Sequence, residues 1–304
     1  MSKKTPTSRS WIFILAGVLL LGTGPLFVKT VPAGGLFIAF YRMLFGSMLL
    51  GIPILAGKRK VIQKKNTSGG ILWAILGGLS YGLNIFLWSS ALKFTTASAV
   101  TLLDNTAPLW VGLYGFLFLK EKQGWIYRLG MAVTFGGAAM LIGTNTFSRS
   151  NAQLTGSLIS IASGFSYAIY QVITRKAREY FSSLQYSWMV AAVGAAGLFL
   201  IAFPLGILNH QVNLSGFLKI FLLALTSQVL AWLMINQALG ELPSSVTSLV
   251  LVGQPVVTTL LAALLINEVP GLWQILGGMI CIAGIFIIQR NTSPVFRKVR
   301  KLDA

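Results

Sequence analysis

A pattern that begins at Ala91 recurs 147 residues later in the same chain. The first copy reads ALKFTTASAVTLLDNTAPLWVGLYGFLFLKEKQGW, and the second, which begins at Ala238, reads ALGELPSSVTSLVLVGQPVVTTLLAALLINEVPGLW. The copies align without a gap. The matched positions include Ser98 with Ser245, Pro108 with Pro255, Glu121 with Glu268, Gly124 with Gly271, Gly130 with Gly277, and Gly137 with Gly284. Two apolar segments that match by chance do not share prolines, glycines and acids at a fixed spacing, so the chain is a duplication.

The composition places this duplication in a membrane. Of the 304 residues 55% are hydrophobic and 10% are charged, and the mean hydropathy is +0.76. This is more apolar surface than a soluble domain of that length buries. The single cysteine, Cys281, lies in an apolar run and the single histidine, His210, in a polar connection. We therefore expect no disulfide, no metal site and no cofactor.

The hydropathy pattern predicts an all-α integral membrane protein with ten transmembrane helices. A helix of roughly 20 apolar residues crosses a hydrocarbon core of about 30 Å. The predicted spans are Trp11 to Val28, Pro32 to Ala56, Gly69 to Leu92, Thr95 to Leu119, Gly124 to Thr144, Leu154 to Thr174, Ser183 to Leu208, Leu214 to Leu239, Pro243 to Ile266, and Gly271 to Gln289. They form one five-helix repeat over residues 11–144 and another over 154–290, with basic tails at 1–10 and 291–304. The first span resembles a signal peptide at its start, but further spans follow it instead of a polar domain, so we interpret it as retained.

The basic residues predict the orientation. With the N-terminus inside, 19 of the 24 Lys and Arg residues lie on the inner side and four on the outer side, while Arg42 lies within the second span. Cytoplasmic loops retain positive charge, so both termini are expected in the cytoplasm, with Gly57 to Ser68 inside and Asn145 to Gln153 outside. The formal charge of +18 is explained by this topology and by anionic lipid, and it does not indicate a nucleic-acid partner.

An odd number of helices per repeat requires the second repeat to enter the membrane from the opposite side. Inverted repeats of this kind generate two related conformations around a site near the midplane, which favours transport by alternating access. The alternative is a duplicated membrane scaffold that transports nothing.

The motifs resemble those of the drug/metabolite transporter superfamily, in its EamA type. The resemblance rests on the ALKFTTAS and ALGELPSS starts, the paired prolines, glutamates and closing glycines, and the FYRM sequence around Arg42. It implies two inverted five-helix repeats and a secondary transporter of small metabolites, often an exporter of amino acids or related compounds. The family is broad, so the resemblance does not identify the substrate.

The prolines and glutamates also have a direct physical interpretation. Pro108 and Pro255 cannot donate a backbone hydrogen bond, so each is expected to kink its helix and to free the carbonyl four residues earlier, either to line a cavity or to bend the helix for packing. Gly24 and Pro25 are expected to break the first span at a gating bend. Glu121 and Glu268 directly follow their spans, which is typical of residues that cap or tie the next helix.

Polar side chains inside the spans are the candidates for a substrate site. Asp104 is the one acid deep in a span, so it is expected to face a cavity, find a partner or carry a proton; a structural role is the alternative, because its repeat counterpart is Leu251. Aromatic and amide side chains recur at helical spacing on the third, sixth and eighth spans, although such residues also serve as interfacial anchors or join helices. The candidate substrate residues are Tyr81, Asn84, Trp88, Thr101, Asp104, Asn105, Tyr167, Gln171, Gln228, Trp232 and Gln254.

Two other classes of membrane protein were compared with a transporter. An intramembrane enzyme needs a clustered base, nucleophile or metal set, which the lone His and lone Cys do not supply. A channel needs rings of charges or carbonyls, and none is evident. A channel and an intramembrane enzyme are the alternatives to a transporter, together with the scaffold. The chain lacks a phosphate-binding glycine loop, so ATP-driven transport is not expected. The expected partners are a small-molecule substrate and the bilayer, with proton coupling as a candidate; the sequence does not determine the oligomeric state.

Overall fold

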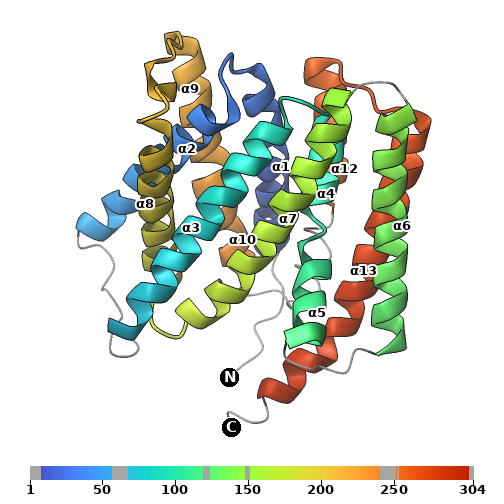
Figure 1. The fold of residues 1–304 in the computed structure, drawn as a ribbon. Helices are drawn as coiled ribbons and strands as arrows, with labels where there is room; N and C mark the ends of the chain where they lie inside the picture. The colour runs from blue at the N-terminus through green and yellow to red at the C-terminus, as the bar shows by residue number, and fades with distance from the viewer. Residues whose placement is uncertain are drawn as a thin grey trace.

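The computed structural model describes residues 8–56, 68–118, 124–147, 151–239, 251 and 253–300. In this part of the chain all regular structure is helical (Figure 1). The elements are α1 (Ser8–Thr30), α2 (Gly35–Leu55), α3 (Ser68–Ala91), α4 (Ala97–Asp104), α5 (Ala107–Phe118), α6 (Trp125–Phe147), α7 (Asn151–Ala177), α8 (Ser183–Ala202), η1 (Ile207–Asn209), α9 (Leu214–Leu223), η2 (Ala224–Leu230), α10 (Ala231–Leu239), α12 (Gln254–Ile266) and α13 (Leu272–Arg300).

Each of the ten predicted spans contains at least one of these helices, although the first part of the ninth span, 243–250, lies outside the described residues. Helices α4 and α5 together form the fourth span, and α9, the π-helical η2 and α10 run on as the eighth. Among the described residues six helical segments are long and apolar enough to cross a membrane, and the shorter segments Gln254–Ile266 and Leu272–Ile287 are also apolar. Glu121 and the segment Gly57 to Thr67 lie outside the described residues.

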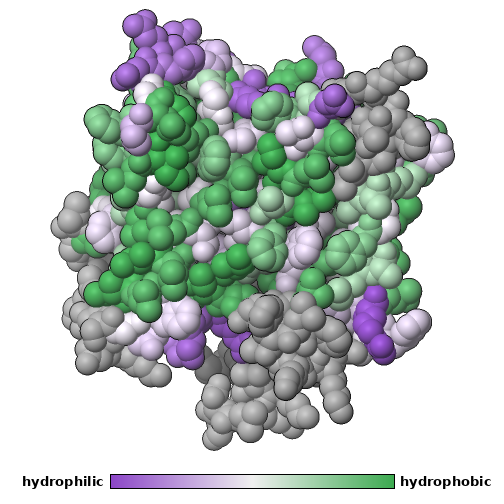
Figure 2. All heavy atoms as spheres, viewed as in Figure 1, coloured by the Kyte–Doolittle hydropathy of each residue, from purple (hydrophilic) through white to green (hydrophobic). Residues whose placement is uncertain are grey.

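The surface supports a membrane location. Apolar side chains cover the middle of the face shown in Figure 2, and strongly hydrophilic ones lie toward its upper and lower ends. Many large apolar side chains of the bundle are exposed, such as Leu200 at 73% and Leu264 at 76%. Such a belt is stable against hydrocarbon tails and unfavourable in water.

The duplication extends over the whole bundle and is not limited to the segment with the clearest sequence match. Adding 147 to the bounds of α2 gives 182–202, where α8 spans Ser183–Ala202. The same shift moves α3 to 215–238, which corresponds to α9, η2 and α10, and moves α5 to 254–265, which corresponds to α12. Each of these helices therefore has a counterpart that begins and ends at nearly the same repeat position, whereas the counterpart position of α4, 244–251, lies almost wholly outside the described residues.

Counterpart helices run in opposite directions. We define the Glu268 end as residues 31–34, 92–96, 203–213 and 267–271, which lie toward the top of Figure 1. Helix α1 ends there, next to segment 92–96. This follows from the Lys93 ammonium, which donates to the carbonyls of Val28 and Val31. Its counterpart α7 starts there, since Gly156 near its beginning lies against the side chain of Thr95. The repeats are therefore inverted.

The contact between α6 and α13 contains the same pair of interactions twice. A Cβ atom added to Gly137 would lie 2.8 Å from the carbonyl oxygen of Gly277, and one added to Gly284 would lie 2.9 Å from that of Gly130. The shift of 147 converts one pair into the other. Backbones this close tolerate only glycine, so the closing glycines of both motifs hold counterpart helices together across the two-fold axis. Cys281 is buried in this contact.

Several predicted boundaries need correction. Helix α13 continues to Arg300 and α1 begins at Ser8, so both helices extend beyond the predicted spans into the predicted basic tails. Helix α8 ends at Ala202 and not at Leu208, since Pro204 follows and Gly206 adopts the left-handed conformation at φ 66°. The predicted loop from Asn145 is shorter, because α6 continues to Phe147.

Candidate functional site

A cavity of about 180 Å³ lies between the two repeats. Both repeats contribute to its wall. The lining residues are Leu21, Gly24, Arg42, Tyr81, Asn84, Ile85, Trp88, Asp104, Asn105, Ala107, Pro108, Tyr167, Gln171, Ser227, Trp232, Leu251, Gln254, Pro255, Ile282 and Ile285. Nine of the eleven candidate substrate residues are among them; the exceptions are Thr101 and Gln228.

The two exceptions are buried and hydrogen-bonded to residues that line the cavity, Thr101 to Asn105 and Gln228 to Arg42. The Thr101 hydroxyl donates to the carbonyl of Ala97 at 2.8 Å within α4, and its side chain is buried. Gln228 is also buried and accepts a hydrogen bond from Arg42, which does line the cavity. Gln228 therefore reaches the cavity through another side chain.

The paired prolines start new helices and do not kink continuous ones. Helix α4 ends at Asp104 and α5 begins at Ala107, so Pro108 occupies the second position of α5. Pro255 occupies the same position in α12. The first N–H groups of a helix have no intrahelical acceptor, so proline is tolerated there at little cost. The two breaks bring helix ends into the cavity wall, where their backbone groups can be satisfied without lipid contact.

The predicted break at Gly24 and Pro25 is absent, because α1 is continuous from Ser8 to Thr30. Pro25 still removes the donor that would bond the carbonyl of Leu21, and Leu21 lines the cavity. Gly24 allows α1 to approach Ser227, whose Oγ would lie 3.2 Å from an added Cβ. Gly24 is thus a close-packing position in the cavity wall, whereas Pro25 does not line it.

Asp104 connects three helices of the wall. Its Oδ1 accepts hydrogen bonds from the Ser163 hydroxyl at 2.6 Å and from the Asn84 amide at 3.1 Å. The same amide donates to the Ser163 carbonyl at 3.1 Å, so α3, α4 and α7 meet at one polar cluster. Among the described residues none donates to Oδ2. The Asp104 carboxyl group therefore retains an acceptor atom for a ligand or a proton.

Arg42 is a cavity residue that the candidate list omitted. It comes from α2, is 5% exposed, and its Nε donates to Gln228 Oε1 at 3.3 Å. Its guanidinium carbon lies 5.1 Å from the centre of the Trp88 ring, a cation–π distance. Its Nη1 is buried without a hydrogen-bond partner. The sequence did contain a signal for Arg42, since a basic residue inside a span is unusual. The candidate residues had been chosen among aromatic, amide and acidic side chains, so Arg42 was missed.

The eighth span is distorted where it meets the cavity. Residues 224–230 form the π-helix η2, and the Ser227 hydroxyl donates to the carbonyl of Leu223 at 2.7 Å. Single π-turns inside α-helices occur frequently at functional sites, because they re-aim side chains. Here the π-turn places Ser227 on the cavity and Gln228 against Arg42.

Tyrosine rings extend from the cavity away from the Glu268 end. Tyr81 and Tyr167 line the cavity, and their ring centres lie 4.6 Å and 5.9 Å from that of Tyr170. Tyr170 in turn stacks with Tyr186 at 6.3 Å. Tyr186 packs with Ala177, the last residue of α7. This aromatic path leads from the cavity toward the opposite end of the bundle.

The Glu268 end is closed by apolar packing. A buried cluster from both repeats surrounds the end of α3, with Val28, Val31, Leu92, Leu223 and Ala262 among its members. Trp88 belongs both to this cluster and to the cavity wall. The cluster therefore separates the cavity from this end of the molecule.

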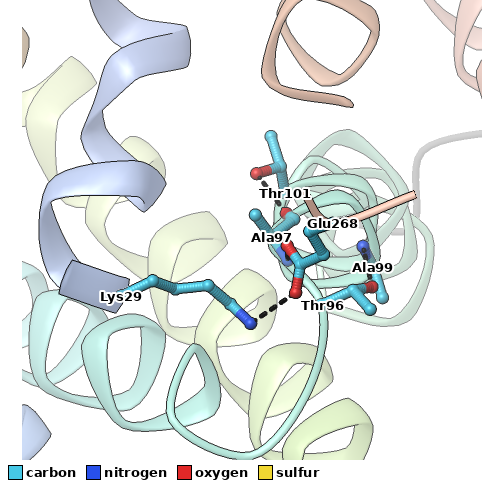
Figure 3. A network of polar contacts seen from close by, with 6 residues as sticks. All are labelled: Lys29, Thr96, Ala97, Ala99, Thr101 and Glu268. Atoms are coloured by element: carbon cyan, nitrogen blue, oxygen red, sulfur yellow. Dashed lines mark hydrogen bonds and ion pairs between the residues drawn. The ribbon is translucent and has the colours of Figure 1, made fainter. Parts of the chain in front are cut away.

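Glu268 adds polar contacts to the same closure (Figure 3). Its Oε1 pairs with the Lys29 ammonium, and its Oε2 accepts the backbone N–H of Ala97 at 2.8 Å. Ala97 is the first residue of α4, so the Glu268 carboxylate caps a helix of the other repeat. The sequence had suggested that it would cap or tie the following helix, α13. Nearby, burial and the adjacent Lys29 charge lower the pKa of Lys93 to about 8.

Comparison with known proteins identifies the family. Residues 9–143 and 154–290 each match the EamA-like transporter family. The chain belongs to this family. It is therefore a multi-pass membrane transporter of the drug/metabolite transporter superfamily and not an enzyme. The two matched regions are the two inverted halves of the bundle.

Individual relatives agree with this assignment. An Archaeoglobus fulgidus protein named an uncharacterized transporter is 26% identical over 82% of this chain and 86% of its own length. The transporter YdfC of Bacillus subtilis is 24% identical over 82% of this chain and 79% of its own length. A solved crystal structure matches 94% of the chain and 99% of its own with a TM-score of 0.62 at 18% identity, which supports the fold alone.

Proposed function

We propose that this EamA-family protein is a secondary transporter that moves a small amphipathic metabolite, an amino acid or a derivative as first candidate, by alternating access and in the direction of export. The observation that carries the proposal is the position of the cavity, which is lined by both members of an inverted pair of repeats. Inverted repeats can exchange their conformations, and the exchange opens such a cavity to either side in turn.

The closed Glu268 end supports one stage of this cycle. Apolar packing around Trp88 and the contacts of Glu268 separate the cavity from that end. We place the Glu268 end outside the cell and both termini in the cytoplasm, because 19 of the 24 basic residues then lie inside. The protein in this structure is then closed toward the exterior.

Cysteine labelling in intact cells tests the orientation. Cys281→Ala provides a background without native thiols, and Ser148→Cys is expected to react with an impermeant reagent whereas Thr67→Cys is not. The reverse pattern would contradict the orientation, and equal labelling of both would contradict a single orientation.

The substrate class rests on the chemistry of the cavity wall. Trp88, Trp232 and Tyr81 offer apolar rings with hydrogen-bonding groups, while Asn84 and Gln171 offer amides. Such a surface suits a compact molecule with an apolar part and a polar part. A screen of metabolites in purified proteoliposomes, without ATP and with or without a pH gradient, tests the proposal. Saturable flux with exchange is expected; dependence on ATP or unsaturable flux would refute a carrier.

We further propose Asp104 as the proton site of a coupled cycle, because its partly buried carboxyl group lies on the cavity wall and Oδ2 has no donor among the described residues. Asp104→Asn preserves the shape and the two hydrogen bonds to Oδ1 but cannot ionise. It should abolish gradient-driven flux while it spares substrate exchange. Asp104→Leu, which copies the counterpart Leu251, should damage both. A fully coupled Asn variant would exclude Asp104 as the proton site.

A further inference from the structure

Arg42 is a buried cation that forms no ion pair with an acid in the described part of the chain. Its side chain lies in the membrane-embedded α2 at 5% exposure, and among the described residues no carboxylate lies within ion-pair distance of it. The nearest acid on the cavity wall, Asp104, bonds to Asn84 and Ser163 instead. A buried charge without a partner is costly, so such a residue usually binds something that the protein itself does not supply.

The contacts of Arg42 hold its guanidinium group in one orientation. The hydrogen bond from Nε to Gln228 holds one edge of the guanidinium group, and the guanidinium carbon lies over the Trp88 ring, 5.1 Å from the ring centre. Of the three guanidinium nitrogens, only Nε has a hydrogen-bond partner among the described residues. The edge formed by Nη1 and Nη2 has no such partner, and its shape matches the two oxygens of a carboxylate in a bidentate pair. Nη1 is covered by protein atoms in this conformation, so a carboxylate reaches this edge only after neighbouring side chains of the cavity wall move aside.

The remaining wall suits the apolar part of the same ligand. The repeat counterparts of the two charged residues are Met189 for Arg42 and Leu251 for Asp104. Leu251 lines the cavity together with Ile282 and Ile285 of α13, so the second repeat contributes an apolar patch to a wall to which it also contributes uncharged polar side chains such as Gln171 and Gln254. Both charged groups of the cavity wall therefore lie in the first repeat, and the apolar patch of the second repeat offers a surface for the apolar part of a ligand.

We propose that Arg42 binds the carboxylate of the transported molecule, so that the substrates are apolar metabolites with one carboxylate group. This inference rests on the proposed transport function and names the substrate class of the same cavity. A bidentate pair with a buried arginine gives a roughly 10- to 100-fold preference over a ligand that lacks the carboxylate. Lysine at this position keeps the charge but presents no planar fork, so it recovers the preference only in part.

Binding measurements on the purified full-length protein test the proposal with chemically matched probes. L-Leucine and 4-methylpentanoate carry the carboxylate, whereas L-leucinamide and 3-methylbutylamine lack it. Isothermal titration and competition within a panel of apolar amino acids are expected to show binding of the carboxylate probes and a loss of roughly 10- to 100-fold without the carboxylate. Comparing leucine with 4-methylpentanoate then distinguishes an amino acid from a simple carboxylic acid as the source of that group.

Arg42→Met should remove this preference and leave the affinity for leucinamide unchanged, and Arg42→Lys should be intermediate. Arg128→Met is the matched control, because Arg128 lies against Trp125 on α6 and does not line the cavity; it should keep the preference. A thermal unfolding transition verifies that each variant is folded. If Arg42→Met does not fold, Arg42→Lys is used instead, and the same ratio is measured, that of the affinity for leucine to the affinity for leucinamide.

Three outcomes would overturn the inference: no member of the panel binds, the carboxylate makes no difference to wild-type affinity, or Arg42 variants weaken all probes equally. The transport function has a separate criterion. If the metabolite screen finds saturable flux of a molecule without a carboxylate, the substrate class is wrong and the carrier function stands. If it finds no saturable flux at all, the transport proposal itself fails.

Discussion

Removing the negative charge of Glu268 should open the cavity toward the exterior. Glu268 joins α1 to α4 through Lys29 and the N–H of Ala97, and neither charged side chain is fully exposed, at 20% for Lys29 and 18% for Glu268. These contacts hold together helices that have to separate if the Glu268 end opens. Glu268→Gln keeps an acceptor for the N–H but removes the ion pair and the charge at the start of α4.

The size of the effect follows from these contacts. An exposed ion pair contributes up to about 1 kcal/mol, and hydrogen bonds to charged groups contribute roughly 1.5–3 kcal/mol. We take a loss of about 2 kcal/mol from the closed state for this partly buried pair. Since 1.4 kcal/mol is a factor of ten, the population open at the Glu268 end should rise roughly 30-fold.

The assay measures access to the cavity from outside. Ser227→Cys on the Cys281→Ala background places one small thiol on the cavity wall, and an impermeant reagent added to intact cells reports its labelling rate. Glu268→Gln should raise that rate by up to the same factor. Glu179→Gln is the control, since the Glu179 pair with Lys176 is exposed and joins neighbours on one helix end. A rate for Glu268→Gln within twofold of the parent would refute the role of this contact in closure.

Two further predictions concern helix packing and a titration. Gly137→Ala and Gly284→Ala should each lower the thermal unfolding temperature in detergent by a similar amount, because their added methyl groups meet the same backbone contact in the other repeat; Gly136→Ala should not, since nothing lies within 4 Å of its Cβ position. A lower unfolding temperature for only one of the variants Gly137→Ala and Gly284→Ala would contradict the symmetric contact. Lys93 should release its proton at about pH 8 in the folded protein, so its contribution to the free energy of unfolding becomes more favourable as the pH rises from 8 toward the ordinary lysine value. NMR of methylated lysines should show this pKa, and Lys29→Met should raise it by removing a like charge; an unshifted Lys93 would contradict the burial argument.

The sequence predicted the fold well, because membrane helices and duplications are encoded locally. Apolar length alone locates the spans, and the match of Pro108 with Pro255 fixes the register that all helix pairs follow. The match could not distinguish a kink from a break, since a proline suits both the interior of a bent helix and the second position of a new one. Only the observed bounds of α4 and α5 decide between them.

The side-chain partners were harder to predict, because they join residues far apart in sequence. Glu268 was expected to act on its own helix connection, yet its partners are Lys29 and Ala97, on the other repeat. Arg42 meets Gln228 only because α2 packs against η2, and a single sequence contains no signal for that contact. Residues such as Asn84 and Trp88 were found because polar and aromatic groups at helical spacing are unusual inside a span.

The scaffold is symmetric, whereas the site within it is not. Helix bounds and the glycine contacts between α6 and α13 repeat at a shift of 147, but the charged residues of the cavity, Arg42 and Asp104, both belong to the first repeat. An exchange of conformations between repeats would swap which end of the molecule is closed, and it would leave these two residues on the same helices. We therefore expect a substrate to keep its polar contacts with the first repeat in both states. In the proposed cycle the symmetry would supply the motion, and the departures from it, at Arg42 and Asp104, would supply the recognition.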